Sequence, residues 1–206
     1  MPMRWERMAR SSRQGVMRHR LTLMLSAPLL VACSVTPTPT AIGPPDEPGP
    51  SASELTTGTV TEDGITLAVS AEPAVVAAGV PIDVEAVITH DRPDALVVSG
   101  SGSGIVSFSV TRLEDGLTSG PSAMTGDCAR HQLPAGAPTV VPFSKSGGYS
   151  PDDPNADFLD IYFSRPELTL PLGTWQVDVA THGSLGEGCG GPPLDLTVSV
   201  VVTVTD

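Results

Sequence analysis

Oxygen-bearing side chains alternate in one short stretch of the chain. Asp153, Asn155 and Asp157 occupy every second position, as the oxygen ligands do in many calcium loops. The spacing then breaks, because Phe158 stands where such a loop needs its turn glycine and Ser164 stands where it needs a bidentate glutamate. A regular calcium loop is therefore excluded, while an irregular calcium site stays an alternative.

The same stretch also has the pattern of a helix start. An Asp/Pro turn would cap a short helix at about 154–163, with Asp152 or Asp153 as the N-cap residue. We favour this interpretation over the calcium site, because the ligand pattern is incomplete.

Aromatic residues gather around this turn. Five of the seven aromatic residues after Cys33 fall within 21 residues: Phe143, Tyr149, Phe158, Tyr162 and Phe163. We expect the segment from Tyr149 to Phe163 to fold over one end of the domain and to supply its principal contact surface, since long insertions often carry function. The candidate binding residues are Tyr149, Asp153, Asn155, Asp157 and Tyr162.

The pattern of catalytic residues is missing from the sequence. His90, His131 and His182 are the histidines after Cys33, too few for the metal site of a copper–zinc superoxide dismutase. Neither remaining cysteine is followed by the His and Met that a cupredoxin needs, and no Gly-x-Ser-x-Gly elbow occurs. The glycine-rich stretch 100–104 lacks the lysine of a phosphate-binding loop. We expect no enzyme activity, no cofactor and no bound metal.

Two cysteines remain when Cys33 is set aside. Cys128 and Cys189 both lie in glycine-rich stretches that read as loops. An exported protein with two such cysteines is expected to join them in one disulfide. A metal site or a reactive pair is the alternative, with His131 as the one nearby partner.

Charge divides the chain into two unlike parts. Six of the 11 basic residues precede residue 21, whereas the part from Cys33 onward has a net charge of 5 − 22 = −17. So acidic a segment is repelled by phosphate backbones, which argues against nucleic acid as a partner.

The first part has the layout of a secretion signal at residues 1–32. A basic stretch at 17–20 precedes an apolar run of 12 residues, Leu21 to Ala32. This run is too short for a permanent transmembrane helix of about 20 residues. Met17 stands directly before the basic stretch, so either Met1 or Met17 is the start.

The run ends on Leu30-Val31-Ala32-Cys33, which resembles the lipobox of bacterial lipoproteins. The resemblance implies that Cys33 carries a diacylglyceryl group and becomes the first residue of the mature chain. Two acyl chains suffice for stable anchoring, so the protein is expected on the extracytoplasmic face of a cell membrane. An ordinary secretory signal and a single-pass anchor are the alternatives.

A proline-rich segment follows the lipobox. Six prolines lie between residues 37 and 50, with almost no apolar bulk between them. Such a composition predicts a disordered, extended tether at residues 33–54 that holds the domain away from the membrane.

From residue 55 to 206, apolar residues recur with a period of two. The last run is the clearest, with Leu194, Leu196, Val198, Val200, Val202 and Val204 on one face. The pattern predicts an all-β domain, an antiparallel sandwich of seven or eight strands. We expect strands at about 64–72, 80–90, 94–99, 104–113, 138–143, 168–171, 173–182 and 193–205.

Two stretches carry a resemblance to bacterial Ig-like modules. The run from Glu72 to Val87 resembles their first sheet crossing, and the run from Leu170 to Val177 resembles their penultimate strand. The resemblance implies an Ig-like sandwich and says nothing about a site.

These observations favour a non-enzymatic binding or interaction module in the cell envelope, with an envelope protein or the cell wall as its partner. A structural or accessory subunit of an envelope complex is the second hypothesis. An enzyme or metalloprotein is the third.

Overall fold

The computed structural model describes residues 54–206. The predicted signal peptide at 1–32, Cys33 and the predicted tether up to residue 53 lie outside the described residues. Within residues 54–206, no helix has the length and apolar character that crossing a bilayer requires. The described part is an all-β domain with one short helix, which confirms the fold class expected from the sequence.

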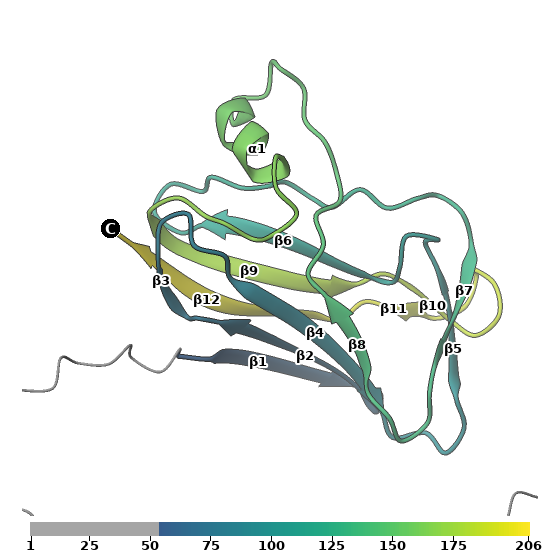
Figure 1. Cartoon of the computed structure of the whole chain (residues 1–206). Helices are drawn as coiled ribbons and strands as arrows, with labels where there is room; N and C mark the ends of the chain where they lie inside the picture. The colour runs from purple at the N-terminus through teal and green to yellow at the C-terminus, as the bar shows by residue number, and fades with distance from the viewer. Residues whose placement is uncertain (1–53) are drawn as a thin grey trace, which may run out of the picture. The chain divides into compact units, whose positions relative to one another are not determined.

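The strands form three four-stranded sheets (Figure 1). Sheet A has the order β1 (Thr56–Glu62), β2 (Ile65–Glu72), β4 (Asp83–His90) and β8 (Thr139–Pro142). Sheet B has the order β3 (Val75–Ala77), β12 (Thr197–Thr205), β9 (Gly173–Thr181) and β6 (Val106–Arg112). Sheet C has the order β11 (Pro193–Leu194), β10 (Gly183–Leu185), β5 (Leu96–Gly100) and β7 (Ala129–Leu133). Helix α1 (Ala156–Phe163) lies in the connection between β8 and β9.

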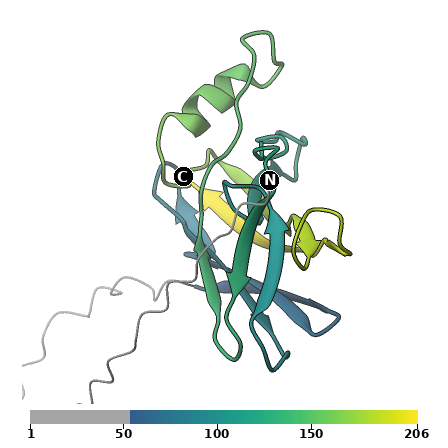
Figure 2. The ribbon, with the colours of Figure 1, turned by 90° about the vertical axis from the view of Figure 1, so that its right-hand side faces the viewer.

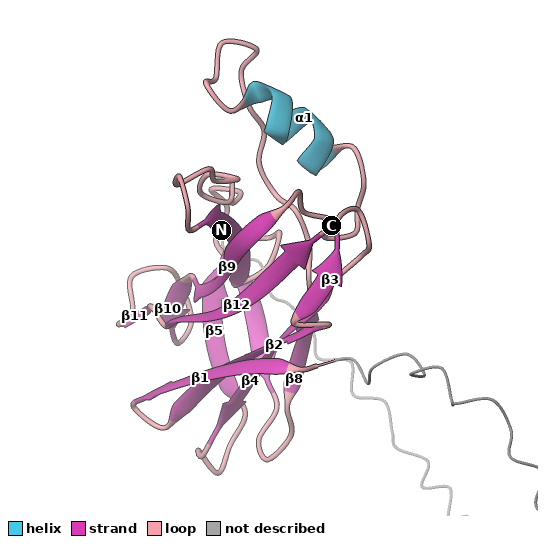
Figure 3. Ribbon diagram, turned by 90° about the vertical axis from the view of Figure 1, so that its left-hand side faces the viewer, coloured by secondary structure: helices cyan, strands magenta, loops and turns pink. Residues whose placement is uncertain are grey.

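Sheets A and B lie face to face as the two main layers (Figure 3). Alternate residues are buried in both, as a period of two requires: Ile65, Leu67, Val69 and Ala71 in β2, and Val198, Val200, Val202 and Val204 in β12. Trp175 of β9 is fully buried in the same core, where its indole Nε1 donates a hydrogen bond of 2.8 Å to the Pro171 carbonyl. The inner faces of both sheets thus form one apolar core.

Six predicted strands are confirmed, with their ends shifted by up to three residues. They are β2, β4, β5, β6, β8 and β9. The predicted strand at 168–171 is wrong, because only Leu168 forms a ladder contact there, an isolated bridge to Ile82. The predicted strand at 193–205 is divided into β11 and β12. Leu196 lies between them, and its backbone N–H donates to the Thr181 hydroxyl instead of to a strand partner.

The sequence did not predict β1, which pairs with β2 through a two-residue turn. Asp63 and Gly64 both have positive φ angles, 50° and 73°, as a type I′ hairpin turn requires. The strand also passes very close to β12, since a Cβ atom at Gly58 would lie 2.6 Å from the Ser199 carbonyl oxygen. Threonine and glycine give β1 little apolar bulk, which is why the apolar period does not reveal it.

The connection between β8 and β9 folds over one end of the sandwich (Figure 2). Its helix begins at Ala156, two residues later than predicted, and Asn155 rather than Asp152 or Asp153 is the N-cap residue. The Asp153 carboxylate accepts the Asn155 backbone N–H at 2.8 Å, so it closes a turn before the helix instead of capping it. The predicted N-cap is therefore wrong, while the predicted helix is confirmed.

Candidate functional site

The segment from Tyr149 to Phe163, here called the lid, is anchored in the core by its aromatic side chains. The ring of Phe158 stacks on Trp175, with 5.3 Å between ring centres and 26° between ring planes. Tyr162 is 2 % exposed and packs against both Phe158 and Phe163. The lid is thus an extension of the core at that end of the sandwich.

Lys145 holds the end of the lid helix. Its ammonium Nζ donates to three backbone carbonyls, those of Tyr162 at 2.5 Å, Glu167 at 2.7 Å and Arg165 at 2.9 Å. It also lies 4.3 Å from the centre of the Tyr162 ring. Burial of the ammonium lowers the pKa of Lys145 to about 8, and the carboxylate of Glu167 acts in the opposite direction. The Tyr162 carbonyl belongs to the last turn of α1, and those of Arg165 and Glu167 belong to the segment after the helix, so this one side chain ties the helix end to that segment.

Tyr149, the first residue of the lid, packs back against the C-terminal half of α1. Its ring stacks on Phe163, with 6.2 Å between ring centres and 8° between ring planes. Its hydroxyl donates a 2.7 Å hydrogen bond to the Asp160 carboxylate, which raises the pKa of Tyr149. The Tyr149 ring is therefore partly buried and its hydroxyl is already paired.

The candidate binding residues do not form one site. Tyr162 lies in the core, Tyr149 is bound to the lid helix, and the Asp153 carboxylate is part of the turn before α1. Asp157 is exposed in the first turn of the helix. Among residues 54–206, no three His, Cys, Asp or Glu side chains are placed to hold a metal ion.

An apolar groove lies between the lid helix and the loops of sheet B. Its volume is about 580 Å³, and its apolar lining comes from separate segments of the chain: Ala78, Leu117, Phe158, Ile161, Leu170 and Pro171. Asp157 and Arg165 are its charged lining residues. A groove of this size and lining suits an apolar group of a ligand or partner.

One lining residue of this groove, Ile161, is a large apolar side chain exposed to solvent. Ile161 is 64 % exposed on α1, the highest value among the exposed large hydrophobic residues of the described part. Val80 and Leu172, which are 45 % and 46 % exposed, directly follow the groove residues Gly79 and Pro171. An exposed apolar side chain that lines an apolar groove is typical of an interaction site. The sequence pointed to this segment but did not single out Ile161.

A second hollow of about 590 Å³ lies on the outer face of sheet A and is acidic. Glu72 and Asp83 face each other across β2 and β4, and Glu85 and Glu167 also line the hollow. No basic residue lines it. Like charges opposite each other weaken a sheet, so this hollow costs stability and gives the surface a negative potential.

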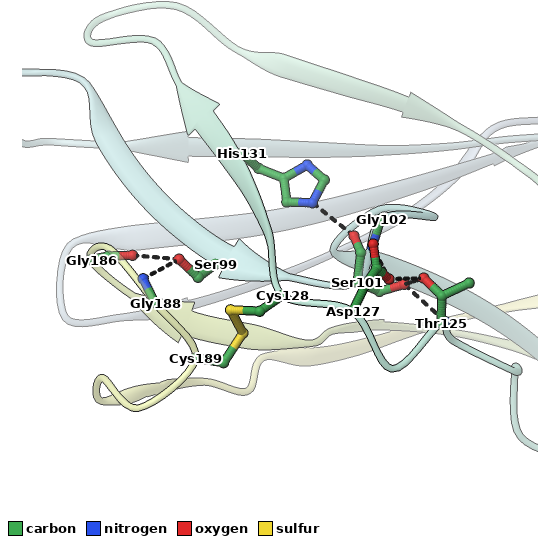
Figure 4. Close-up of a disulfide and its surroundings, with 10 residues drawn as sticks. All are labelled: Ser99, Ser101, Gly102, Thr125, Asp127, Cys128, His131, Gly186, Gly188 and Cys189. Carbon is green, nitrogen blue, oxygen red and sulfur yellow. Dashed lines mark hydrogen bonds between the residues drawn. A yellow bond between two sulfur atoms is a disulfide. The ribbon is translucent and has the colours of Figure 1, made fainter.

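At the other end of the domain, Cys128 and Cys189 form the predicted disulfide (Figure 4). It joins the loop before β7 to the loop between β10 and β11. The Ser99 hydroxyl supports the second loop, since it donates to the Gly186 carbonyl and accepts the Gly188 N–H, each at 2.8 Å. Covalent and hydrogen bonds thus hold this glycine-rich loop.

Beside the disulfide, hydroxyl, carboxylate and imidazole side chains form a cluster that bonds mainly to backbone groups, so its role is structural. The Ser101 hydroxyl oxygen accepts the backbone N–H groups of Ser103 and Thr125, at 3.1 and 3.0 Å. The His131 ring Nε2 lies 2.8 Å from the carbonyl oxygen of Ser101, not from its hydroxyl. Asp127 accepts the Thr125 hydroxyl and the Gly102 N–H, which lowers its pKa. His131 therefore does not activate the Ser101 hydroxyl as a nucleophile.

One serine–histidine pair does have a short contact. The Ser107 hydroxyl lies 2.6 Å from Nε2 of His182, on the exposed surface of the domain. No carboxylate among the described residues bonds the other ring nitrogen of His182, so the ring lacks the orienting group of a catalytic triad. The pair acts as a surface link between β6 and the end of β9.

Comparison of the chain with protein-family profiles, with curated proteins and with solved structures gave no match. The apolar groove beside the lid helix is therefore identified from its own geometry.

Proposed function

We propose that this protein is a lipid-anchored binding module of the bacterial cell envelope. It displays an Ig-like sandwich on the extracytoplasmic face, and the groove beside α1 receives an apolar group of an envelope protein or of the cell wall. The observation that carries the proposal is the apolar lining of this groove, in which the Ile161 side chain is 64 % exposed.

The rigidity of the lid supports binding at this place. Phe158 is stacked on Trp175, which fixes the helix on the sandwich, and Lys145 bonds the Tyr162 carbonyl of the last helical turn and two carbonyls just after the helix. A preformed groove binds without a large ordering cost. The Cys128–Cys189 disulfide supports an oxidising compartment, as expected for an exported domain.

An accessory subunit of an envelope complex is the second candidate. The same exposed apolar side chain favours it, because permanent interfaces are rich in such residues. Purification from native membranes separates the two functions. A subunit remains in a complex of fixed composition, whereas a binding module is released as a single chain.

The anchor is tested by replacing Cys33 with serine. Serine cannot receive the diacylglyceryl group, so the variant should move from the membrane fraction to the soluble extracytoplasmic fraction. Immunoblots of separated fractions measure this. The neighbouring variant Ser34→Ala should stay with the membrane. A Cys33→Ser protein that remained in the membrane fraction would mean that another segment anchors the chain.

The groove is tested by replacing Ile161 with aspartate. We expect the wild-type domain to enhance the fluorescence of the apolar dye ANS, and Ile161→Asp to lose most of this signal, because a carboxylate would occupy the apolar lining. Val201→Asp is the matched control, since Val201 is 44 % exposed on β12 and does not line the groove. Both changes should leave the free energy of unfolding within about 1 kcal/mol. Equal loss in both variants would contradict a local site.

Photo-cross-linking then tests the partner in intact cells. A photoreactive residue at 161 of the full chain should give a discrete adduct, and one at 201 should not. An adduct at neither position would contradict the proposed function.

A further inference from the structure

Strand β1 forms one edge of sheet A, and half of its backbone groups point away from the sheet. The hairpin turn makes Glu62 and Ile65 a hydrogen-bonded pair, so every second residue of β1 bonds to β2. The N–H and C=O groups of Thr57, Thr59 and Thr61 therefore face outward. No backbone hydrogen bond within residues 54–206 occupies them.

The other edges of the described sheets are protected. Pro138 and Pro142 flank and end β8, and prolines block strand addition. The edge of β6 is covered by the following segment, since Arg112 N–H donates to Leu117 and Ser119 N–H donates to Val110. β3 and β11 have three and two residues, and β7 carries the charged Arg130, which pairs with Glu187. β1 has seven residues and no proline, no segment among the described residues is bonded along its outer edge, and its one charged residue, Glu62, stands at the last position before the turn.

We propose that β1 is a docking edge for an extended, basic segment of a partner protein, which adds to sheet A as a further strand. The open ladder supplies the backbone hydrogen bonds of strand addition. This site is separate from the groove beside α1, and it does not depend on the function proposed there.

The charge around β1 determines the kind of segment. Glu62, Asp63 and Asp195 line one hollow at the hairpin tip, and no basic residue lines it. Asp91 lies beside Gly64 at the same tip and is followed by Arg92, so this end keeps a net negative charge. Glu54 stands before the other end of the strand. Carboxylates at both ends attract a strand that carries lysine or arginine at its ends.

The same charges disfavour a second copy of the chain as the occupant. Residues 54–206 contain 5 basic and 20 acidic residues, so two domains repel each other with a net charge of 5 − 20 = −15 each. In antiparallel pairing of two copies of β1 centred on Thr59, Asp63 of one copy would approach the Leu55 end of the other, next to Glu54. Carboxylates would then meet at both ends of the shared ladder.

The test uses two labelled peptides with the same alternating core, KTVTVTK and ETVTVTE. We expect the wild-type domain to bind KTVTVTK in a fluorescence anisotropy titration, with ETVTVTE weaker by about tenfold or more because of repulsion at both ends. The amide signals of Thr57, Thr59 and Thr61 should shift in NMR spectra of the complex. Unchanged signals at these three amides would overturn the proposal without any variant.

Two substitutions of Thr59 separate the contribution of its backbone N–H to peptide binding from that of its side chain. Thr59→Pro removes an outward N–H and should weaken KTVTVTK binding by about tenfold or more, while an edge strand tolerates proline. Thr59→Val keeps the N–H and should bind as the wild type does. Equal binding by Thr59→Pro, or no binding of KTVTVTK by the wild type, would overturn the proposal. A dimer that forms without peptide and is lost in Thr59→Pro would identify a second copy as the occupant instead.

Discussion

Replacing Phe158 with alanine is expected to lower the free energy of unfolding by about 3–5 kcal/mol, the usual cost of truncating a buried phenylalanine. The side chain is 9 % exposed and stacks on Trp175, which is itself fully buried. Its removal leaves a cavity between the lid and the sandwich. Urea unfolding of the purified domain, followed by tryptophan fluorescence, measures the loss, and Trp175 reports on the same contact.

The matched control lies three residues further along the same helix. Ile161→Ala removes an apolar side chain that is 64 % exposed, so it should change the free energy of unfolding by less than about 0.5 kcal/mol. If Phe158→Ala were equally mild, the lid would be a loosely attached loop and the groove beside it would not be preformed. A large difference between the variants would instead show that α1 is part of the core.

The sandwich was predictable where one face of a strand is buried and apolar. In β12, every second residue from Val198 to Val204 is a buried valine, and this buried set is the set that the sequence places on one face. In β2 and β9, too, the buried apolar set is the one that the sequence places on one face. The sequence reveals such strands because successive side chains of a strand point to opposite faces, so one buried face needs an apolar residue at every second position.

Other strands, such as β1 and β7, were not predicted because contacts other than apolar alternation hold them in place. β1 depends on a tight turn at Asp63–Gly64 and on close backbone approach at Gly58, and neither depends on apolar alternation. β7 has only Leu133 fully buried, and it pairs with β5 beside the disulfide. Sheet C therefore depends on contacts between segments that are far apart in the sequence, such as the pairing of β7 with β5 and the disulfide. A local sequence pattern cannot show such contacts.

For the lid, the sequence predicted the packing of the segment but not the orientation of its side chains. Its aromatic content predicted a segment packed over the domain, which is what the structure has. The orientation of each ring was not predictable, and Tyr162, a candidate contact residue, is in the core. The neighbouring Ile161 is exposed instead, because a helix turns successive residues to different faces.

Removing the disulfide is the second change with a large expected effect. Replacing both Cys128 and Cys189 with serine should lower the free energy of unfolding by about 4 kcal/mol on the chain-entropy model, since the bond closes a long loop in the unfolded chain. The two cysteines are 61 positions apart in the sequence. Urea unfolding of the oxidised wild type and of the double variant measures the difference. Hydrogen exchange should also accelerate in the loop at 186–192.

The control is Glu187→Ala, which removes a side-chain link between the same glycine-rich loop and strand β7. Its ion pair with Arg130 is solvent-exposed, so the loss should stay below about 1 kcal/mol. Reduction of the wild-type protein should reproduce the loss seen in the double serine variant, because both remove the same covalent constraint. A double variant as stable as the control would mean that the Ser99 hydrogen bonds alone hold the loop. Equal losses on reduction and on substitution would assign the effect to the covalent link itself, rather than to the serine side chains.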